Sequence, residues 1–172
     1  MGARRWRIGM AGAMVLSGIG ALLAMAQPVG AATSAGTLYS ITGSAQFTQP
    51  LTVAVAGDFA YSFTGALAPV APGGPSGTIA ATGGGTGGCL SGSGSGQALV
   101  TWTDGQSSDV AYLTQSVGAV VVVTGQVDSG EYTGSTLNGA LAFQVSDPQD
   151  CAGGGVTAAT FTGGADLGAS AQ

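Results

Sequence analysis

The chain has 172 residues, of which three are basic, eight are acidic and none is histidine. The basic residues, Arg4, Arg5 and Arg7, all lie near the N-terminus. The only charged side chains in the rest of the chain are therefore acidic, and they give it a side-chain charge of −8. This composition excludes nucleic-acid binding, which depends on Lys and Arg contacts to phosphates. It also excludes catalytic triads and zinc sites that require histidine.

Residues 1–32 have the three parts of a secretory signal peptide. The basic stretch precedes an apolar run over 8–26, and small residues that signal peptidase accepts follow it. We expect cleavage after Ala31 or Ala32, which leaves a secreted, extracellular domain over 33–172 with no membrane contact. The alternative is a retained transmembrane anchor, for which the run is barely long enough and is diluted by Gly and Ser.

Residues 33–172 have the length of a single domain and are rich in Gly. Short runs of alternating apolar and polar residues recur along them, separated by Gly, Pro, Asp and Ser. This pattern predicts β-strands, and no segment after residue 32 has the spacing of an amphipathic helix. The strands expected in chain order are 38–47, a short one over 51–55, 59–63, 77–82, 91–103, 109–116, 119–127, 132–146 and 156–162.

Two of these strands carry more specific expectations. Phe59, Tyr61 and Phe63 alternate with small residues, so their rings are expected on one face of a strand. The unbroken run Val120–Val123 predicts a strand that is covered on both faces.

The segments between the strands are expected to form turns and loops. Asp104-Gly105 predicts a hairpin turn, and Asp128-Ser129-Gly130 is expected to form another. Residues 83–88 are expected to form a flexible connection, and residues 164–172 a frayed tail.

Eight or nine antiparallel strands joined in sequence order predict an all-β meander, either an up-and-down β-barrel or a β-sandwich. Cys89 and Cys151 are the only two cysteines, and an even pair in an exported chain is most simply one disulfide. It would enclose a loop of about 63 residues, for which loop entropy gives about 4 kcal/mol. Such a bridge suits a late strand that returns beside an earlier one.

Four sequence features lie between the two cysteines and shortly after them. They are a Ser/Gly run after Cys89, VTWTDG over 100–105, TGQVDSG over 124–130, and GVTAATF over 155–161 after Cys151. In these features the chain resembles small uncharacterised secreted β proteins of actinobacteria, over about half of the expected mature chain. The resemblance implies an extracellular β domain, and it supplies no catalytic residue and no known activity.

Six of the eight acidic residues fall in three pairs near the expected turns: Asp104 with Asp109, Asp128 with Glu131, and Asp147 with Asp150. Such pairs could serve a carboxylate-only hydrolase, and D-S-G at 128–130 has the letters of half an aspartic-protease site. Oxygen ligands also suit calcium, for which the loop candidates are Asp128 with Glu131 and Asp147 with Asp150. We expect all of these to be solvated turn acids, with no metal site, no cofactor and no catalytic residue.

Aromatic residues divide between the expected core and possible ligand contacts. Trp102 shares a face with Val100 and is expected in the core. The four tyrosines, which are expected at a surface or a barrel mouth, are Tyr39, Tyr61, Tyr112 and Tyr132.

The composition favours a non-catalytic, monomeric secreted domain that acts by binding or surface association with an unidentified extracellular ligand or partner. The first alternative is a small-molecule carrier with its ligand in a barrel or sandwich cavity, and the second is the carboxylate-only hydrolase. An aromatic-lined cavity larger than about 300 Å³ would favour the carrier.

Overall fold

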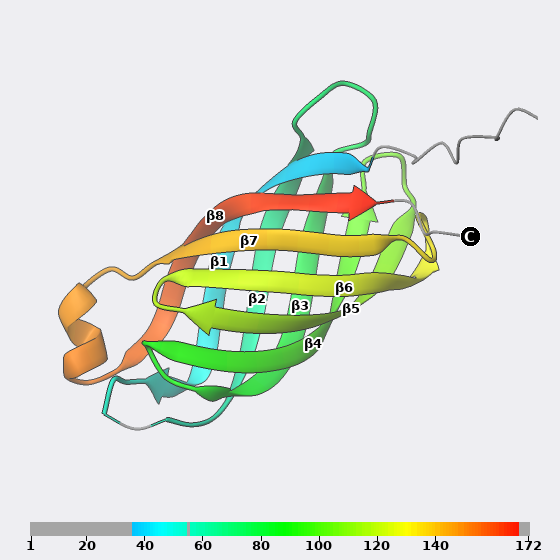
Figure 1. Ribbon diagram of the computed structural model, residues 1–172. Helices are drawn as coiled ribbons and strands as arrows, with labels where there is room; N and C mark the ends of the chain where they lie inside the picture. The colour runs from blue at the N-terminus through cyan, green and yellow to red at the C-terminus, as the bar shows by residue number, and fades with distance from the viewer. Residues whose placement is uncertain (1–35, 55, 169–172) are drawn as a thin grey trace, which may run out of the picture. The chain divides into compact units, whose positions relative to one another are not determined.

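The computed structural model describes residues 36–54 and 56–168, all of which lie in the unit 33–172 (Figure 1). The expected signal peptide over 1–32 and the last four residues of the expected tail lie outside the described residues. The described elements are β1 (Thr37–Leu51), β2 (Gly57–Pro69), β3 (Gly77–Gly87), β4 (Ser91–Trp102), β5 (Ser107–Val117), β6 (Val120–Gly130), β7 (Thr136–Gln144), the 3-10 helix η1 (Pro148–Ala152) and β8 (Val156–Gly168).

The strands form a closed antiparallel barrel (Figure 1). Each strand pairs with the next in sequence, and β8 pairs with β1 to complete the ring. The predicted all-β meander is therefore confirmed, and its form is the up-and-down barrel. Closure gives every strand two hydrogen-bonded neighbours, so the sheet has no free edge.

Side chains alternate between the inside and the outside of the barrel, as strand geometry requires. In β7 the inner positions are Leu137, Leu141 and Phe143, while Asn138 and Ala140 face outward and are exposed. The alternation of apolar and polar residues in the sequence of β7 predicts these same inner and outer positions.

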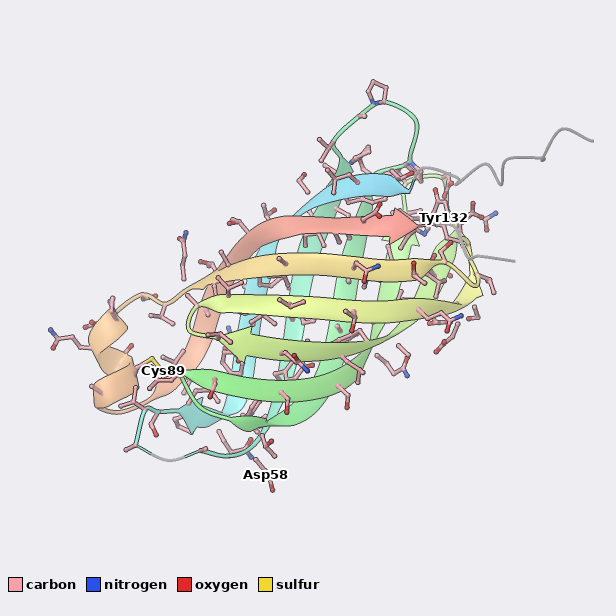
Figure 2. All side chains as sticks on the ribbon, in the orientation of Figure 1. Asp58, Cys89 and Tyr132 are labelled. Carbon is pink, nitrogen blue, oxygen red and sulfur yellow. A yellow bond between two sulfur atoms is a disulfide. The ribbon has the colours of Figure 1, made fainter. Side chains whose placement is uncertain are left out.

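The connections between strands gather at two ends of the barrel. One end, here called the mouth, carries the connections 52–56, 88–90, 118–119 and 145–155. The opposite, closed end carries the other three connections and both ends of the described barrel. Figure 2 shows Cys89 at the mouth and Tyr132 at the closed end.

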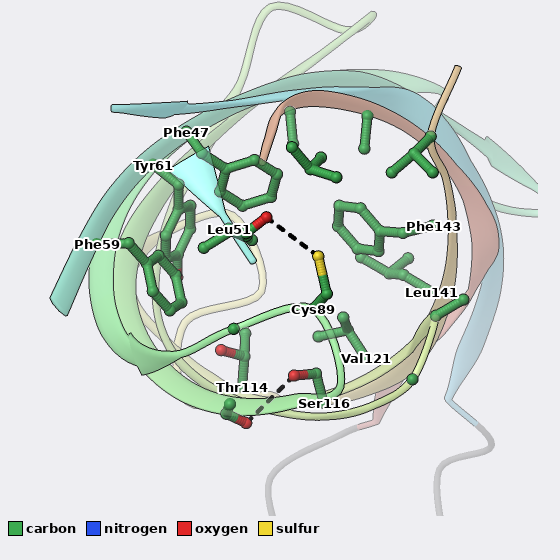
Figure 3. Close-up of a pocket in the computed structure, with 18 of the residues that line it drawn as sticks. Phe47, Leu51, Phe59, Tyr61, Cys89, Thr114, Ser116, Val121, Leu141 and Phe143 are labelled. Carbon is green, nitrogen blue, oxygen red and sulfur yellow. Dashed lines mark hydrogen bonds between the residues drawn. The ribbon is translucent and has the colours of Figure 1, made fainter. Parts of the chain in front are cut away.

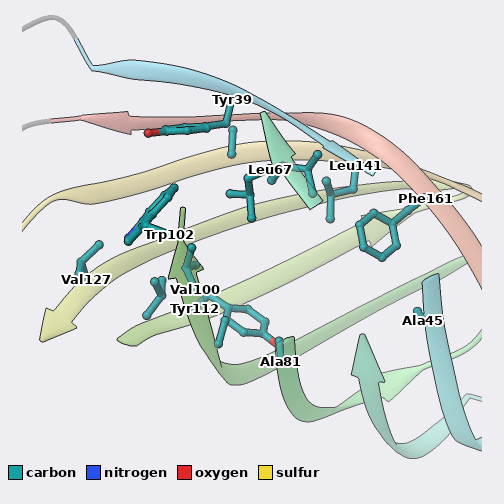
Figure 4. Close-up of a cluster of buried hydrophobic side chains, with 14 residues drawn as sticks. Tyr39, Ala45, Leu67, Ala81, Val100, Trp102, Tyr112, Val127, Leu141 and Phe161 are labelled. Atoms are coloured by element: carbon teal, nitrogen blue, oxygen red, sulfur yellow. The ribbon is translucent and has the colours of Figure 1, made fainter. Parts of the chain in front are cut away.

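The buried hydrophobic core cluster extends to the closed end, where it contains Tyr39 and Trp102 (Figure 4). The Trp102 ring lies 5.4 Å from that of Tyr39 and 5.3 Å from that of Tyr132, measured between centroids. Its indole N–H donates to Ser108 Oγ at 2.8 Å, and the Ser108 hydroxyl donates to the Glu131 carbonyl oxygen at 2.5 Å. The expectation that Trp102 belongs to the core is confirmed.

Several predicted segment ends are wrong, and in two of them Gly-containing backbone continues the ladder. Of the short strand expected over 51–55, Leu51 belongs to β1, residues 52–54 are not strand, and residue 55 lies outside the described residues. The expected flexible connection at 83–88 belongs mostly to β3, where Gly83–Gly87 pair with both β2 and β4. The expected frayed tail is strand as far as Gly168, because residues 164–168 of β8 pair with β7.

The expected turn at Asp128-Ser129-Gly130 is also wrong. A register shift after Asp109 lets β6 continue, so that Ser129 pairs with Asp109 and Gly130 with Ser108. The chain turns instead over residues 131–135, where Tyr132 has a positive φ of 62°. The turn at Asp104-Gly105 is confirmed.

The run Val120–Val123 is not covered on both faces. Val121 and Val123 point inward, whereas Val120 and Val122 are 49% and 50% exposed on the outer surface. A barrel has a single layer, so among the described residues nothing packs over this face.

Candidate ligand cavity at the barrel mouth

A cavity of about 320 Å³ lies inside the barrel at the mouth (Figure 3). It opens at this end, and the closed end below it is filled by the core. The size reaches the lower end of the range typical of small-molecule sites. A second hollow of about 670 Å³ on the outer face of β4–β6 is more open to solvent and is lined mainly by small and polar side chains.

Aromatic rings from β1 and β2 form one wall of the cavity. Phe47 and Phe59 lie 6.1 Å apart edge to face, and Phe59 lies 6.0 Å from Tyr61. Tyr61 and Phe63 are stacked, with 6.5 Å between centroids and 8° between planes. The prediction that Phe59, Tyr61 and Phe63 share a face is confirmed, and the face is the inner one.

The facing wall is mainly aliphatic and comes from β6 and β7. Its side chains include Val121, Val123 and Leu141, together with the ring of Phe143. Phe143 packs against Phe161, whose ring lies 5.3 Å away below the cavity. The cavity is therefore enclosed by apolar groups on two opposite sides.

The third side of the barrel at the mouth is formed by strands without inward side chains of their own. At the mouth half of β3 and β4 the inner positions are glycines, among them the paired Gly83 and Gly96. A Cβ at Gly83 would lie 2.6 Å from the Tyr61 hydroxyl, and one at Gly96 would lie 2.4 Å from the Tyr112 hydroxyl. Glycine here allows the two tyrosines, which come from β2 and β5, to lie across the wall. The expectation that the Ser/Gly run 91–96 is a strand is confirmed.

Three hydroxyl groups meet beside this glycine wall. The Tyr112 hydroxyl is fully buried and has no hydrogen-bond partner among the described residues. The Tyr61 hydroxyl lies next to it and makes a long contact of 3.5 Å to the Ser95 carbonyl oxygen. A Cβ at Gly94 would lie 3.0 Å from Thr114 Oγ1 and 3.5 Å from Tyr61 Cε1, so Thr114 completes the group. We call Tyr61, Tyr112 and Thr114 the hydroxyl cluster.

The tyrosines of the cluster are neutral at physiological pH, and burial moves their pKa still further from it. Burial raises the pKa of Tyr61, and the hydroxyls of Tyr112 and Thr114 partly offset this rise. Burial also raises the pKa of Tyr112, and the neighbouring Tyr61 adds to the effect. At physiological pH both phenols are therefore protonated and can donate as well as accept hydrogen bonds.

The cavity contains no charged side chain. None of the described residues that line it is Asp, Glu, Lys, Arg or His. A charged ligand would lose its hydration there without gaining an opposite charge, which is strongly unfavourable. The cavity therefore suits uncharged molecules.

The acidic pairs lie on the surface, and none of their side chains lines the cavity. Asp104 accepts a hydrogen bond from the Gln106 backbone N–H at 3.0 Å, and Asp109 accepts one from Ser129 at 2.6 Å. Of the calcium candidates Asp128, Glu131, Asp147 and Asp150, three are exposed and Glu131 is half-buried. Among the described residues no three acidic, His or Cys side chains gather closely enough to hold a metal ion.

The predicted disulfide joins Cys89 and Cys151 and is confirmed, with 5.9 Å between their Cα atoms. It ties the β3–β4 connection to η1, and both cysteines line the cavity. The β1–β2 connection joins them through two backbone bonds, Val53 N–H to the Cys151 oxygen at 2.9 Å and Cys89 N–H to the Thr52 oxygen at 3.1 Å. The fourth connection joins them as well, because the Gly118 N–H donates to the Leu90 carbonyl oxygen at 2.8 Å. All four mouth connections are thus fastened together beside the opening, where Figure 3 shows Cys89.

The chain matches no protein-family model, no curated protein and no solved structure. No helix in the described residues is long and apolar enough to cross a bilayer.

We expect the domain to lose stability at alkaline pH. Burial raises the pKa of Tyr39, Tyr61 and Tyr112 above the ordinary value of 10.0. The folded state then holds these protons more tightly than the unfolded state, so this contribution to stability is complete below pH 10 and falls as the pH rises further. Urea unfolding measures the free energy of unfolding at each pH. The contribution of the three tyrosines to it should be constant up to about pH 10 and should decline above this pH. Phenolate absorbance of these tyrosines that rises before the barrel unfolds would contradict this expectation.

Proposed function

We propose that this domain is an extracellular carrier that binds a small, uncharged, apolar molecule in the mouth cavity. The observation that carries the proposal is an aromatic-lined cavity of about 320 Å³ without a single charged side chain. A domain that only associated through its surface would have no need of unfilled space in its core, because filling such space stabilises a fold. The disulfide and the signal-like N-terminus support a site of action outside the cell.

The positions of the acids argue against the carboxylate-only hydrolase. Such an enzyme needs two carboxyl groups that face each other across a cleft. Here no acid lines the cavity, and seven of the eight acids are exposed at strand ends, turns or the outer surface.

A fluorescent probe tests the proposal. N-phenyl-1-naphthylamine is uncharged and brightens in apolar surroundings, whereas anilinonaphthalene sulfonate is a related anion. We expect the folded domain to bind the uncharged probe at least about tenfold more tightly, because the cavity offers no cation to a sulfonate.

Two adjacent valines on β6 provide a matched pair of variants. Val121→Phe places extra volume in the cavity and should weaken binding of the uncharged probe at least about tenfold. Val122→Phe puts the same change on the outer surface and should leave the affinity within about twofold. Equal binding by both variants would contradict the proposal and assign the probe to the exposed aliphatic residues outside the barrel.

A further inference from the structure

We infer that the cavity is built for a planar aromatic molecule that carries one hydroxyl or carbonyl group, with this group placed at Tyr61 and Thr114 of the hydroxyl cluster. This inference deepens the proposed function and rests on it. It assigns an orientation to the ligand, with the polar group at the glycine wall and the rings between the aromatic and aliphatic walls.

The shape of the walls favours a planar ligand. The rings of Phe47, Phe59 and Tyr61 follow one another at centroid distances of about 6 Å along one side of the cavity. Leu141 and Val121 face them from the other side. Aromatic rings pair well in offset-stacked and edge-to-face arrangements, so a flat ring system in this space gains contacts with several side chains.

The hydroxyl cluster supplies the polar contacts. Buried hydroxyls normally have hydrogen-bond partners, and one without a partner has lost its water contacts without compensation. Among the described residues the Tyr112 hydroxyl makes no hydrogen bond of normal geometry, and the Tyr61 hydroxyl makes a long one of 3.5 Å to the Ser95 carbonyl oxygen. Thr114 lies on the cavity surface beside Tyr61. Ser116, by contrast, already donates to the Gly92 carbonyl oxygen at 3.3 Å.

The same cluster discriminates between kinds of polar group. Its members are neutral hydroxyls, which can donate to a carbonyl or exchange hydrogen bonds with a hydroxyl. They cannot neutralise a carboxylate or phosphate, and the described chain has no Lys, Arg or His that could do so. No lining acid is present to pair with an amine. Neutral phenols and aromatic ketones therefore fit best.

A series of three probes with one ring system tests this assignment. Naphthalene, 2-naphthol and 2-naphthoate would each be titrated as competitors of N-phenyl-1-naphthylamine at neutral pH. We expect 2-naphthol to bind about fivefold to tenfold more tightly than naphthalene, the ratio that one additional net hydrogen bond gives. The anion 2-naphthoate should bind at least about tenfold more weakly than naphthalene.

Variants locate the hydrogen bond. Thr114→Val and Tyr61→Phe remove one hydroxyl each with little change in shape, and each should reduce the advantage of 2-naphthol over naphthalene to about twofold or less. Naphthalene binding should persist in both variants, which also shows that they are folded. Thr124→Val on the exposed outer face of β6 is the matched control and should keep the full advantage.

The outcomes separate the two proposals. Failure of both naphthalene and 2-naphthol to compete would overturn the proposed function itself. Equal affinities for naphthalene and 2-naphthol would overturn the hydroxyl cluster as the polar site. So would an advantage of 2-naphthol that survives in both Thr114→Val and Tyr61→Phe. Neither result would contradict binding in the apolar cavity. Binding of 2-naphthoate as tight as that of naphthalene would refute the requirement for a neutral ligand.

Discussion

Trp102→Ala is expected to lower the free energy of unfolding by about 3–5 kcal/mol, the range for removing a large buried aromatic side chain. Trp102 is buried at the closed end between Tyr39 and Tyr132. The substitution would leave a void there and remove the indole donor to the fully buried Ser108. Urea unfolding followed by far-UV circular dichroism measures the change without relying on the lost fluorophore.

Two controls separate packing from the hydrogen bond. Trp102→Phe keeps most of the ring volume but loses the indole N–H, so it should cost less than Trp102→Ala. Leu99→Ala changes an apolar residue on the same strand that is 45% exposed on the outer surface, and it should cost less than about 1 kcal/mol. A loss for Trp102→Ala as small as that for Leu99→Ala would contradict the position of Trp102 in the core.

Removal of the disulfide is expected to lower the free energy of unfolding by about 4 kcal/mol. Cys89 and Cys151 are 62 positions apart, and a cross-link of this length greatly restricts the unfolded chain. The double variant Cys89→Ser with Cys151→Ser should therefore unfold at lower urea concentration than the oxidised protein. Reduction of the native protein gives an independent comparison without a change of sequence.

The same change should affect the mouth more than the closed end. The bridge fastens the β3–β4 connection to η1, with the β1–β2 connection bonded to both. Amide hydrogen exchange in the folded double variant should therefore increase at residues 52–54, 88–90 and 148–152 and remain slow at Trp102. A uniform increase along all strands, or no loss of stability, would contradict a local role for the bridge at the mouth.

Much of the fold could be predicted because β-strand alternation is visible in single segments. Phe59, Tyr61 and Phe63 show their shared face without any knowledge of their neighbours. The disulfide followed from the count of two cysteines. Strand ends at Gly83–Gly87 were missed because glycine has no side chain that favours a strand, although its backbone completes the ladder equally well.

The cavity could not be predicted because it depends on register. Tyr61 and Tyr112 meet only because β2 and β5 flank two strands in which Gly83 pairs with Gly96. Nothing in either strand alone gives this alignment. Phe143 and Val121 were expected in strands but not beside a ligand. The signal that could have been used is the alternating glycine of 83–87 and 92–96, which leaves one inner wall of a barrel without side chains.

The central claim is that an uncharged ligand binds inside the barrel mouth, and the most direct test is the location of bound 2-naphthol by nuclear Overhauser effects in solution. We predict contacts from its ring protons to the methyl groups of Val121 and Leu141 and to the rings of Phe47 and Phe59. Contacts confined to the exposed methyl groups of Val120 and Val122 would place the ligand on the outer surface and contradict the claim.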